Sequence, residues 1–135
     1  MPFVARTREF LSNPQQFLNN ANISTRRQDE MIATINFLLQ QAGSVNLDRI
    51  VEHLISQGHA IGPTQWQQEV LDPLRDSGVF IGSSNRGYFI PRDRDQAIDA
   101  YRFYVKRIIA ESQRSGILAD LIRRGGWGLP NIQID

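Results

Sequence analysis

Hydrophobic side chains recur every three to four residues in four stretches of the chain, and this spacing predicts amphipathic helices. The predicted helices cover residues 25–42, 47–57, 64–77 and 93–115. Thr25 and Gln28 have the spacing of a capping box at the first of these helices, and Asp93 suits the start of the last. Each helix is followed by a glycine or glycine-containing turn, the usual signal for a helix end. Gly116 is therefore expected to end the last helix, although residues 117–124 can add two further turns.

The first 22 residues have a separate helical pattern. Phe3, Phe10 and Phe17 recur every seven residues, and a parallel aliphatic series recurs beside them. Pro14 cannot continue an incoming helix, but it suits the first turn of a new one that is capped by Asn13. We therefore predict an N-terminal arm of two short helices over residues 1–22, packed on the body or on a partner chain.

Two runs of aromatic and β-branched residues, 79–81 and 88–90, predict short strands. The polar segment 82–87 between them is rich in Gly, Ser and Asn and predicts the loop of a β-hairpin. Residues 44–46 are expected to form a short connector with a β-bridge. The predicted fold class is therefore mainly α with a small β-hairpin.

The order helix, bridge, helix, helix, hairpin over residues 28–91 resembles the winged helix-turn-helix family. The segments 71–75 (LDPLR) and 87–91 (GYFIP) look like modules of bacterial and phage DNA-processing proteins, including those attached to modification-dependent restriction endonucleases. The resemblance implies double-stranded DNA binding, with helix 64–77 in the major groove and the hairpin, or wing, at the backbone or minor groove. Any nuclease activity is then expected in a fused domain outside this chain.

Ten residues are candidate DNA contacts under this interpretation. At the start of the third helix, glutamine amides can read an adenine edge and a threonine hydroxyl can reach a phosphate. A wing arginine can enter the minor groove, and the polar residues beside it can bind phosphates. A basic pair at the start of the first long helix opposes the helix dipole, which favours an anionic partner. The candidates are Thr64, Gln65, Gln67, Gln68, Ser83, Ser84, Asn85, Arg86, Arg26 and Arg27.

Acidic residues weaken this interpretation. Glu69, Asp72 and Asp76 follow the glutamines and would repel phosphates. The net charge of the chain is only +1, although 14 of its 15 basic residues are arginine. Arginine suits phosphates and guanine edges, but GC-rich codon usage explains the same excess. A winged helix that binds protein instead of DNA is therefore the alternative.

The composition argues against catalysis in this chain. There is no cysteine, and the two histidines, His53 and His59, have no ligand cluster around them in the sequence. No phosphate loop, nucleophile elbow or metalloprotease motif occurs. We expect no catalytic residue, no metal site and no cofactor.

The chain is expected to divide into an arm (1–22), a winged-helix domain (23–92), a long helical segment (93–124) and a flexible tail or truncated linker (125–135). No run of about 18 apolar residues and no secretory signal is visible, so we expect a cytoplasmic protein without a membrane span. The arm and the long helix together suggest a homodimer, and the Gly/Pro-rich tail suggests one piece of a longer protein.

Overall fold

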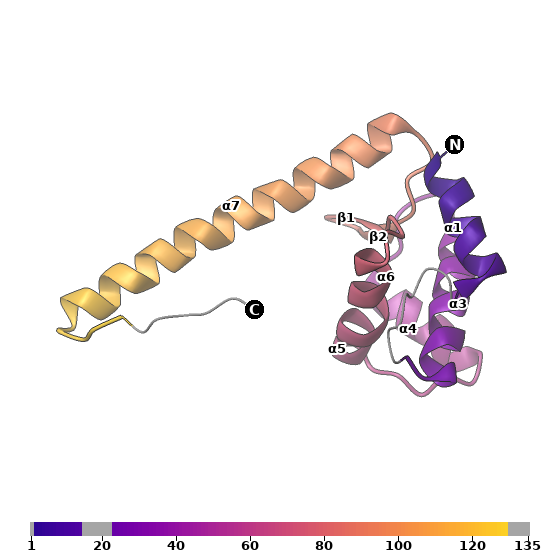
Figure 1. Ribbon diagram of the computed structural model, residues 1–135, viewed down its shortest axis with the longest axis horizontal. Coiled ribbons are helices and arrows are strands. Elements are labelled where there is room, and N and C mark those ends of the chain that lie inside the picture. The colour runs from indigo at the N-terminus through magenta and orange to yellow at the C-terminus, as the bar shows by residue number, and fades with distance from the viewer. Residues whose placement is uncertain (1, 15–22, 130–135) are drawn as a thin grey trace. The chain divides into compact units, whose positions relative to one another are not determined.

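The computed structural model describes residues 2–14 and 23–129, which form helices and one small sheet (Figure 1). The prediction of a mainly helical chain with a β-hairpin is confirmed. The elements are α1 (Pro2–Ser12), α3 (Thr25–Gln40), α4 (Leu47–Ser56), α5 (Pro63–Trp66), the π-helix η1 (Gln67–Leu71), α6 (Asp72–Asp76), β1 (Gly82–Ser84), β2 (Gly87–Phe89) and α7 (Arg94–Arg124). The chain divides into an N-terminal unit up to Tyr101 and a C-terminal unit from Arg102.

The first long helix begins at a different cap from the one predicted. The side chain of Ser24, not Thr25, accepts a hydrogen bond from the backbone N–H of Arg27. Gln28 donates its amide to the carbonyl of Ile23 at 3.1 Å, so the predicted capping-box partner still secures the helix start. The helix ends at Gln40, two residues before the predicted end, because the backbone of Gln41 is extended.

The third helical segment is interrupted near Pro73, the residue expected to kink or shorten the predicted helix over residues 64–77. A π-helical turn separates α5 from α6, and the N–H of Asp72 bonds to the carbonyl of Gln67, five residues earlier. Pro73 follows immediately and has no N–H to give to the carbonyl four residues before it. Pro73 therefore favours the π-helical turn before it, which is wider than an α-helical turn. The segment then continues as α6.

The first strand of the hairpin lies later in the sequence than predicted, and the second begins one residue earlier. Its strands are Gly82–Ser84 and Gly87–Phe89, joined by a two-residue turn, instead of 79–81 and 88–90 around a six-residue loop. Residues 79–81 are a buried connector, in which the N–H of Val79 bonds to the carbonyl of Leu74. Their β-branched side chains fill the core, and burial without strand pairing gives the same sequence pattern as a strand.

Two contacts fix the base of the hairpin in the N-terminal unit. Val45 and Tyr88 form a β-bridge with two backbone hydrogen bonds of 2.8 Å, which confirms the bridge predicted at residues 44–46. On the other strand, a Cβ at Gly82 would lie 2.7 Å from the Cβ of Ala100. Glycine at this position lets the first turns of α7 approach the hairpin.

The hydrophobic core of the N-terminal unit includes the described half of the predicted arm. Phe10 is fully buried and joins the core, and Phe3 packs edge-on against Phe80 with ring centroids 5.3 Å apart. Helix α1 is therefore part of the body. Phe17 and the second predicted arm helix lie outside the described residues.

Helix α7 begins as predicted and ends later than predicted. The N–H of Gln96 bonds to the Asp93 carboxylate at 2.8 Å, which confirms the cap. Gly116 does not end the helix, because one exposed glycine costs only about 1 kcal/mol relative to alanine and the flanking turns tolerate it. The helix ends at Arg124, and Gly126 follows in the left-handed region at φ 80°. In the described part of the chain, no helix has both the length and the apolar character needed to cross a bilayer.

Candidate nucleic-acid interface

The third helical segment and the hairpin are joined through the side chain of Tyr88. Gln67 donates its amide to the Tyr88 hydroxyl at 3.0 Å. The Tyr88 ring also packs edge-on against Trp66, with ring centroids 5.0 Å apart. Because Tyr88 is held at its backbone by the bridge to Val45, these contacts couple the helix, the hairpin and the connector after α3.

Arg75 makes a second connection between the helix and the hairpin. Its Nε donates to the carbonyl of Ile81 at 2.8 Å, and its Nη2 donates to the hydroxyl of Ser83 at the same distance. The guanidinium carbon lies 5.9 Å from the centroid of the Tyr88 ring. Arg75 is therefore committed to positioning the hairpin, a role that sequence reasoning missed because nothing in the local sequence marks it.

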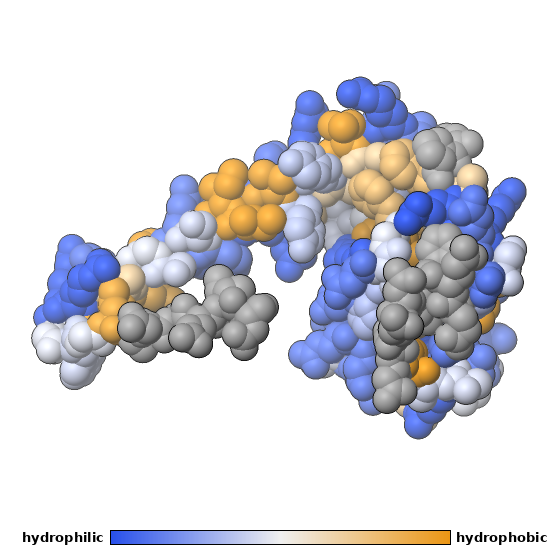
Figure 2. All heavy atoms as spheres, in the orientation of Figure 1, coloured by the Kyte–Doolittle hydropathy of each residue, from blue (hydrophilic) through white to orange (hydrophobic). Residues whose placement is uncertain are grey.

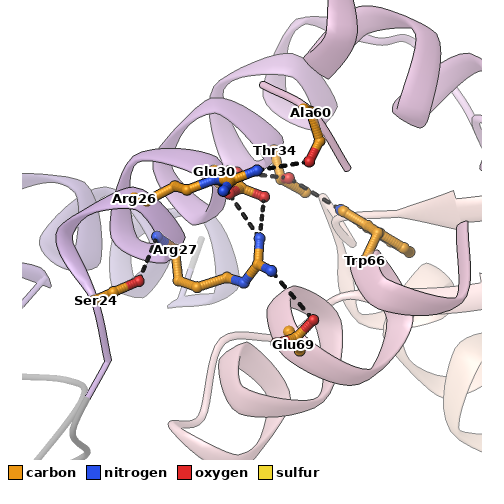
Figure 3. Close-up of polar contacts among 8 residues, drawn as sticks. All are labelled: Ser24, Arg26, Arg27, Glu30, Thr34, Ala60, Trp66 and Glu69. Carbon is orange, nitrogen blue, oxygen red and sulfur yellow. Dashed lines mark hydrogen bonds and ion pairs between the residues drawn. The ribbon is translucent and has the colours of Figure 1, made fainter. Parts of the chain in front are cut away.

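Trp66 anchors the start of the third segment in the core. Its ring is fully buried, and its N–H donates to the hydroxyl of Thr34 at 3.1 Å (Figure 3). Thr34 in turn donates to the backbone carbonyl of Glu30 at 2.8 Å. Because the Trp66 ring is fixed in the core, the neighbouring side chains of this segment are either exposed to solvent or bonded to the hairpin.

The four side chains predicted to contact DNA at this helix start differ in their exposure to solvent. Thr64 and Gln68 are exposed, and Gln65 is half-buried. Gln67 is half-buried and bonded to Tyr88, so its amide stabilises the hairpin in this structure. The structure thus leaves three of the four side chains accessible to a partner.

The predicted wing residues also separate into two groups. Ser83 is buried against Arg75. Ser84 shares a 2.9 Å hydrogen bond with Ser44, and its hydroxyl accepts from the backbone N–H of Arg86 at 3.1 Å. Only Asn85 and Arg86, the two turn residues, are exposed, which reduces the accessible tip to an amide and a guanidinium.

The basic pair at the start of α3 interacts mainly with the protein itself. Arg27 Nη1 lies 2.7 Å from both carboxylate oxygens of the fully buried Glu30, and its Nη2 lies 3.2 Å from Glu69 (Figure 3). Arg26 donates to the carbonyl of Ala60 at 2.7 Å and lies 3.4 Å from Glu30. The spacing of Glu30, three and four residues after the arginines, is the sequence signal for this network.

Burial distinguishes the two arginines. The Arg27 side chain is only 15% exposed, whereas the Arg26 side chain is 60% exposed. Both remain predicted DNA contacts, although both also bond within the protein. Glu69 is engaged with Arg27, while Asp72 and Asp76 on α6 are exposed to solvent. The accessible surface of the third segment is therefore neutral at its start and acidic further along.

The histidines do not form part of a metal site in the described residues. His53 stacks on Phe37 with ring centroids 4.0 Å apart, a packing role that the sequence analysis did not anticipate. Among residues 2–14 and 23–129, no three His, Asp or Glu side chains are close enough together to hold a metal ion. Comparison with known protein families, with curated proteins and with solved structures finds no match for the chain.

Proposed function

We propose that the N-terminal unit is a winged helix-turn-helix domain that binds double-stranded DNA. The observation that supports this proposal is the double connection between the third helical segment and the hairpin, through Gln67–Tyr88 and Arg75–Ser83. A reader of this class needs its helix and wing held in a constant relation, because both contact one duplex. The resemblance to DNA-processing modules further suggests a role within a larger bacterial or phage protein.

The proposed contacts are the accessible candidates at the start of the third segment and at the hairpin turn. Thr64, Gln65 and Gln68 would face the major groove, where a glutamine amide can both donate to and accept from adenine. Arg86, with Asn85 beside it, would reach the backbone or the minor groove. Gln67, Ser83 and Ser84 are assigned a positioning role because each is bonded within the protein.

The acidic residues of α6 limit how the duplex can lie. Asp72 and Asp76 are exposed, so the proposal brings only the first turn of the segment to the groove. With so few cations at the contact, we expect weak salt dependence, equivalent to about one or two released counterions. For a non-specific duplex, a Kd of about 1–100 μM at moderate salt follows from the same principle.

Fluorescence anisotropy of a labelled duplex tests the proposal. Arg86→Ala and Gln68→Ala should each weaken binding about 5-fold or more, in line with the loss of one charged or bidentate contact. Arg8→Ala is the matched control, because Arg8 is an exposed arginine on α1 outside the proposed surface. The proposal is wrong if the Arg86 and Gln68 variants bind as well as the Arg8 variant, with all three folded by circular dichroism.

A protein-binding role is the second candidate, favoured by the exposed carboxylates of Asp72 and Asp76. Under this alternative, the same face would accept a basic protein surface, and the polar tip would carry no phosphate. The absence of any anisotropy change at about 100 μM protein and low salt supports this second candidate over the first, because a Kd at the weak end of the expected range would still half-saturate the duplex.

A further inference from the structure

Helix α7 carries apolar side chains that no described residue covers. Tyr104, Ile108, Ile109 and Leu118 are 50%, 55%, 53% and 60% exposed. Figure 2 shows orange, hydrophobic side chains along the visible face of this helix. Exposed apolar groups gathered in this way are typical of an interaction surface.

Ile108 belongs to a heptad pattern, and the other three exposed residues lie beside it. Positions spaced alternately by three and four residues along α7 fall on one face, the geometry of a coiled-coil seam. We call this set the α7 seam, and its members are Val105, Ile108, Ser112, Ser115, Ala119 and Ile122. Val105 and Ile108 begin the seam, three small residues follow, and Ile122 ends it. Tyr104, Ile109 and Leu118 flank it.

We propose that two copies of this chain pair through the α7 seam as an antiparallel coiled coil. The pairing is centred near residue 110, so that Val105 lies opposite Ser115 of the partner subunit and Ile108 opposite Ser112 of the partner subunit. The proposal is independent of DNA binding, because it uses α7 and none of the proposed contact residues.

Side-chain size favours the antiparallel orientation. In a parallel pair each residue meets its own copy, so Ser112 would face Ser112 and Ser115 would face Ser115 across the axis. Those layers would lack apolar contact in the middle of the interface. The antiparallel register puts both serines of the seam opposite larger residues, Ser112 opposite Ile108 of the partner subunit and Ser115 opposite Val105 of the partner subunit, so these two layers gain apolar contact.

The charges along α7 favour the same register. It brings Asp95 opposite Arg123 of the partner subunit, at positions that flank the seam. Sliding the helices by one heptad would instead bring Arg102 against Arg123, two like charges. The register also places the two Glu111 carboxylates near the dyad, but each already has Arg114 of its own chain at 2.8 Å. Antiparallel helix dipoles add a small favourable term.

Sedimentation velocity of the full chain across a concentration series tests the pairing. We expect a monomer–dimer equilibrium that Ile108→Glu shifts toward monomer by at least about 100-fold in Kd, because each dimer acquires two buried carboxylates. Ile117→Glu is the matched control. Ile117 is 61% exposed, and its heptad position lies on the opposite face of α7. A wild-type protein that stays monomeric at about 100 μM, or equal effects of the two variants, would overturn the proposal.

Cysteine cross-linking tests the orientation, because the natural chain has no cysteine. Val105→Cys and Ser115→Cys are prepared separately and mixed under mild oxidation. In the proposed register a disulfide forms between the two variants, whereas two copies of the same variant hold their cysteines about 15 Å apart. Dimers cross-linked only in the mixture support the antiparallel seam. Cross-linking within each variant alone would show a parallel pair, and no cross-linking in any sample would also contradict the register.

Discussion

Removal of the Arg27 side chain should destabilise the fold more than removal of any exposed arginine. Arg27→Ala takes away two contacts of 2.7 Å from Glu30, whose side chain is fully buried. Breaking a buried ion pair from one side costs about 3–5 kcal/mol, because the remaining charge stays in a poor solvent. Arg26 remains 3.4 Å from Glu30 and is 60% exposed, so it supplies partial compensation. We therefore expect a loss of about 2–3 kcal/mol in the free energy of unfolding.

Urea denaturation followed by circular dichroism measures this loss. With a slope of about 1–3 kcal/mol per molar urea, the midpoint should fall by about 0.7–3 M. Arg8→Ala should change the free energy of unfolding by less than about 0.5 kcal/mol. The double variant Arg27→Met/Glu30→Leu should recover most of the loss, because it removes both charges. A loss below about 0.5 kcal/mol for Arg27→Ala would refute the structural role assigned to this ion pair.

Three further substitutions test separate features of the fold. Gly87→Ala should cost more than about 2 kcal/mol in urea denaturation, because φ is 130° and the new Cβ would clash with the carbonyl oxygen of Val45; a neutral result would contradict the turn geometry. Tyr88→Phe should cost about 1 kcal/mol by releasing the Gln67 amide, and NMR should detect a changed Gln67 side-chain environment; an unchanged spectrum would show that the bond is not formed. Gly116→Ala should raise stability by about 0.5–1 kcal/mol in thermal unfolding, since the site is helical and nothing lies within 4 Å of the added methyl; a loss would mean that the helix breaks there.

The periodicity of the sequence predicts the existence and order of the helices, but hydrogen bonds at the termini decide where each helix begins and ends. Helix α4 follows its prediction because its asparagine cap, Asn46, acts locally on the backbone N–H of Arg49. The strand positions differ because Val79 and Ile81 are apolar for core burial, not for strand pairing. Such a distinction depends on contacts with distant helices, which a linear pattern does not contain.

The candidate site also depends on contacts that a linear pattern does not contain. The sequence identifies residues of the right chemistry at the third segment and the turn, and Thr64, Gln68 and Arg86 are exposed there. It does not reveal that Gln67 and Ser83 are used inside the fold. Their partners, Tyr88 and Arg75, are 21 and 8 residues away. Whether such a polar residue is free to contact a partner or is bonded within the fold depends on its neighbours in space. Only a three-dimensional structure shows those neighbours.

An NMR titration of the isotopically labelled chain with a short duplex tests the central claim most directly. The account predicts that the backbone amides of Thr64, Gln65, Gln68, Asn85 and Arg86 shift together as one saturable set, while α1 and α4 are unaffected. Shifts confined to other elements, or separate saturation of the helix start and the turn, would contradict the claim that one duplex contacts both.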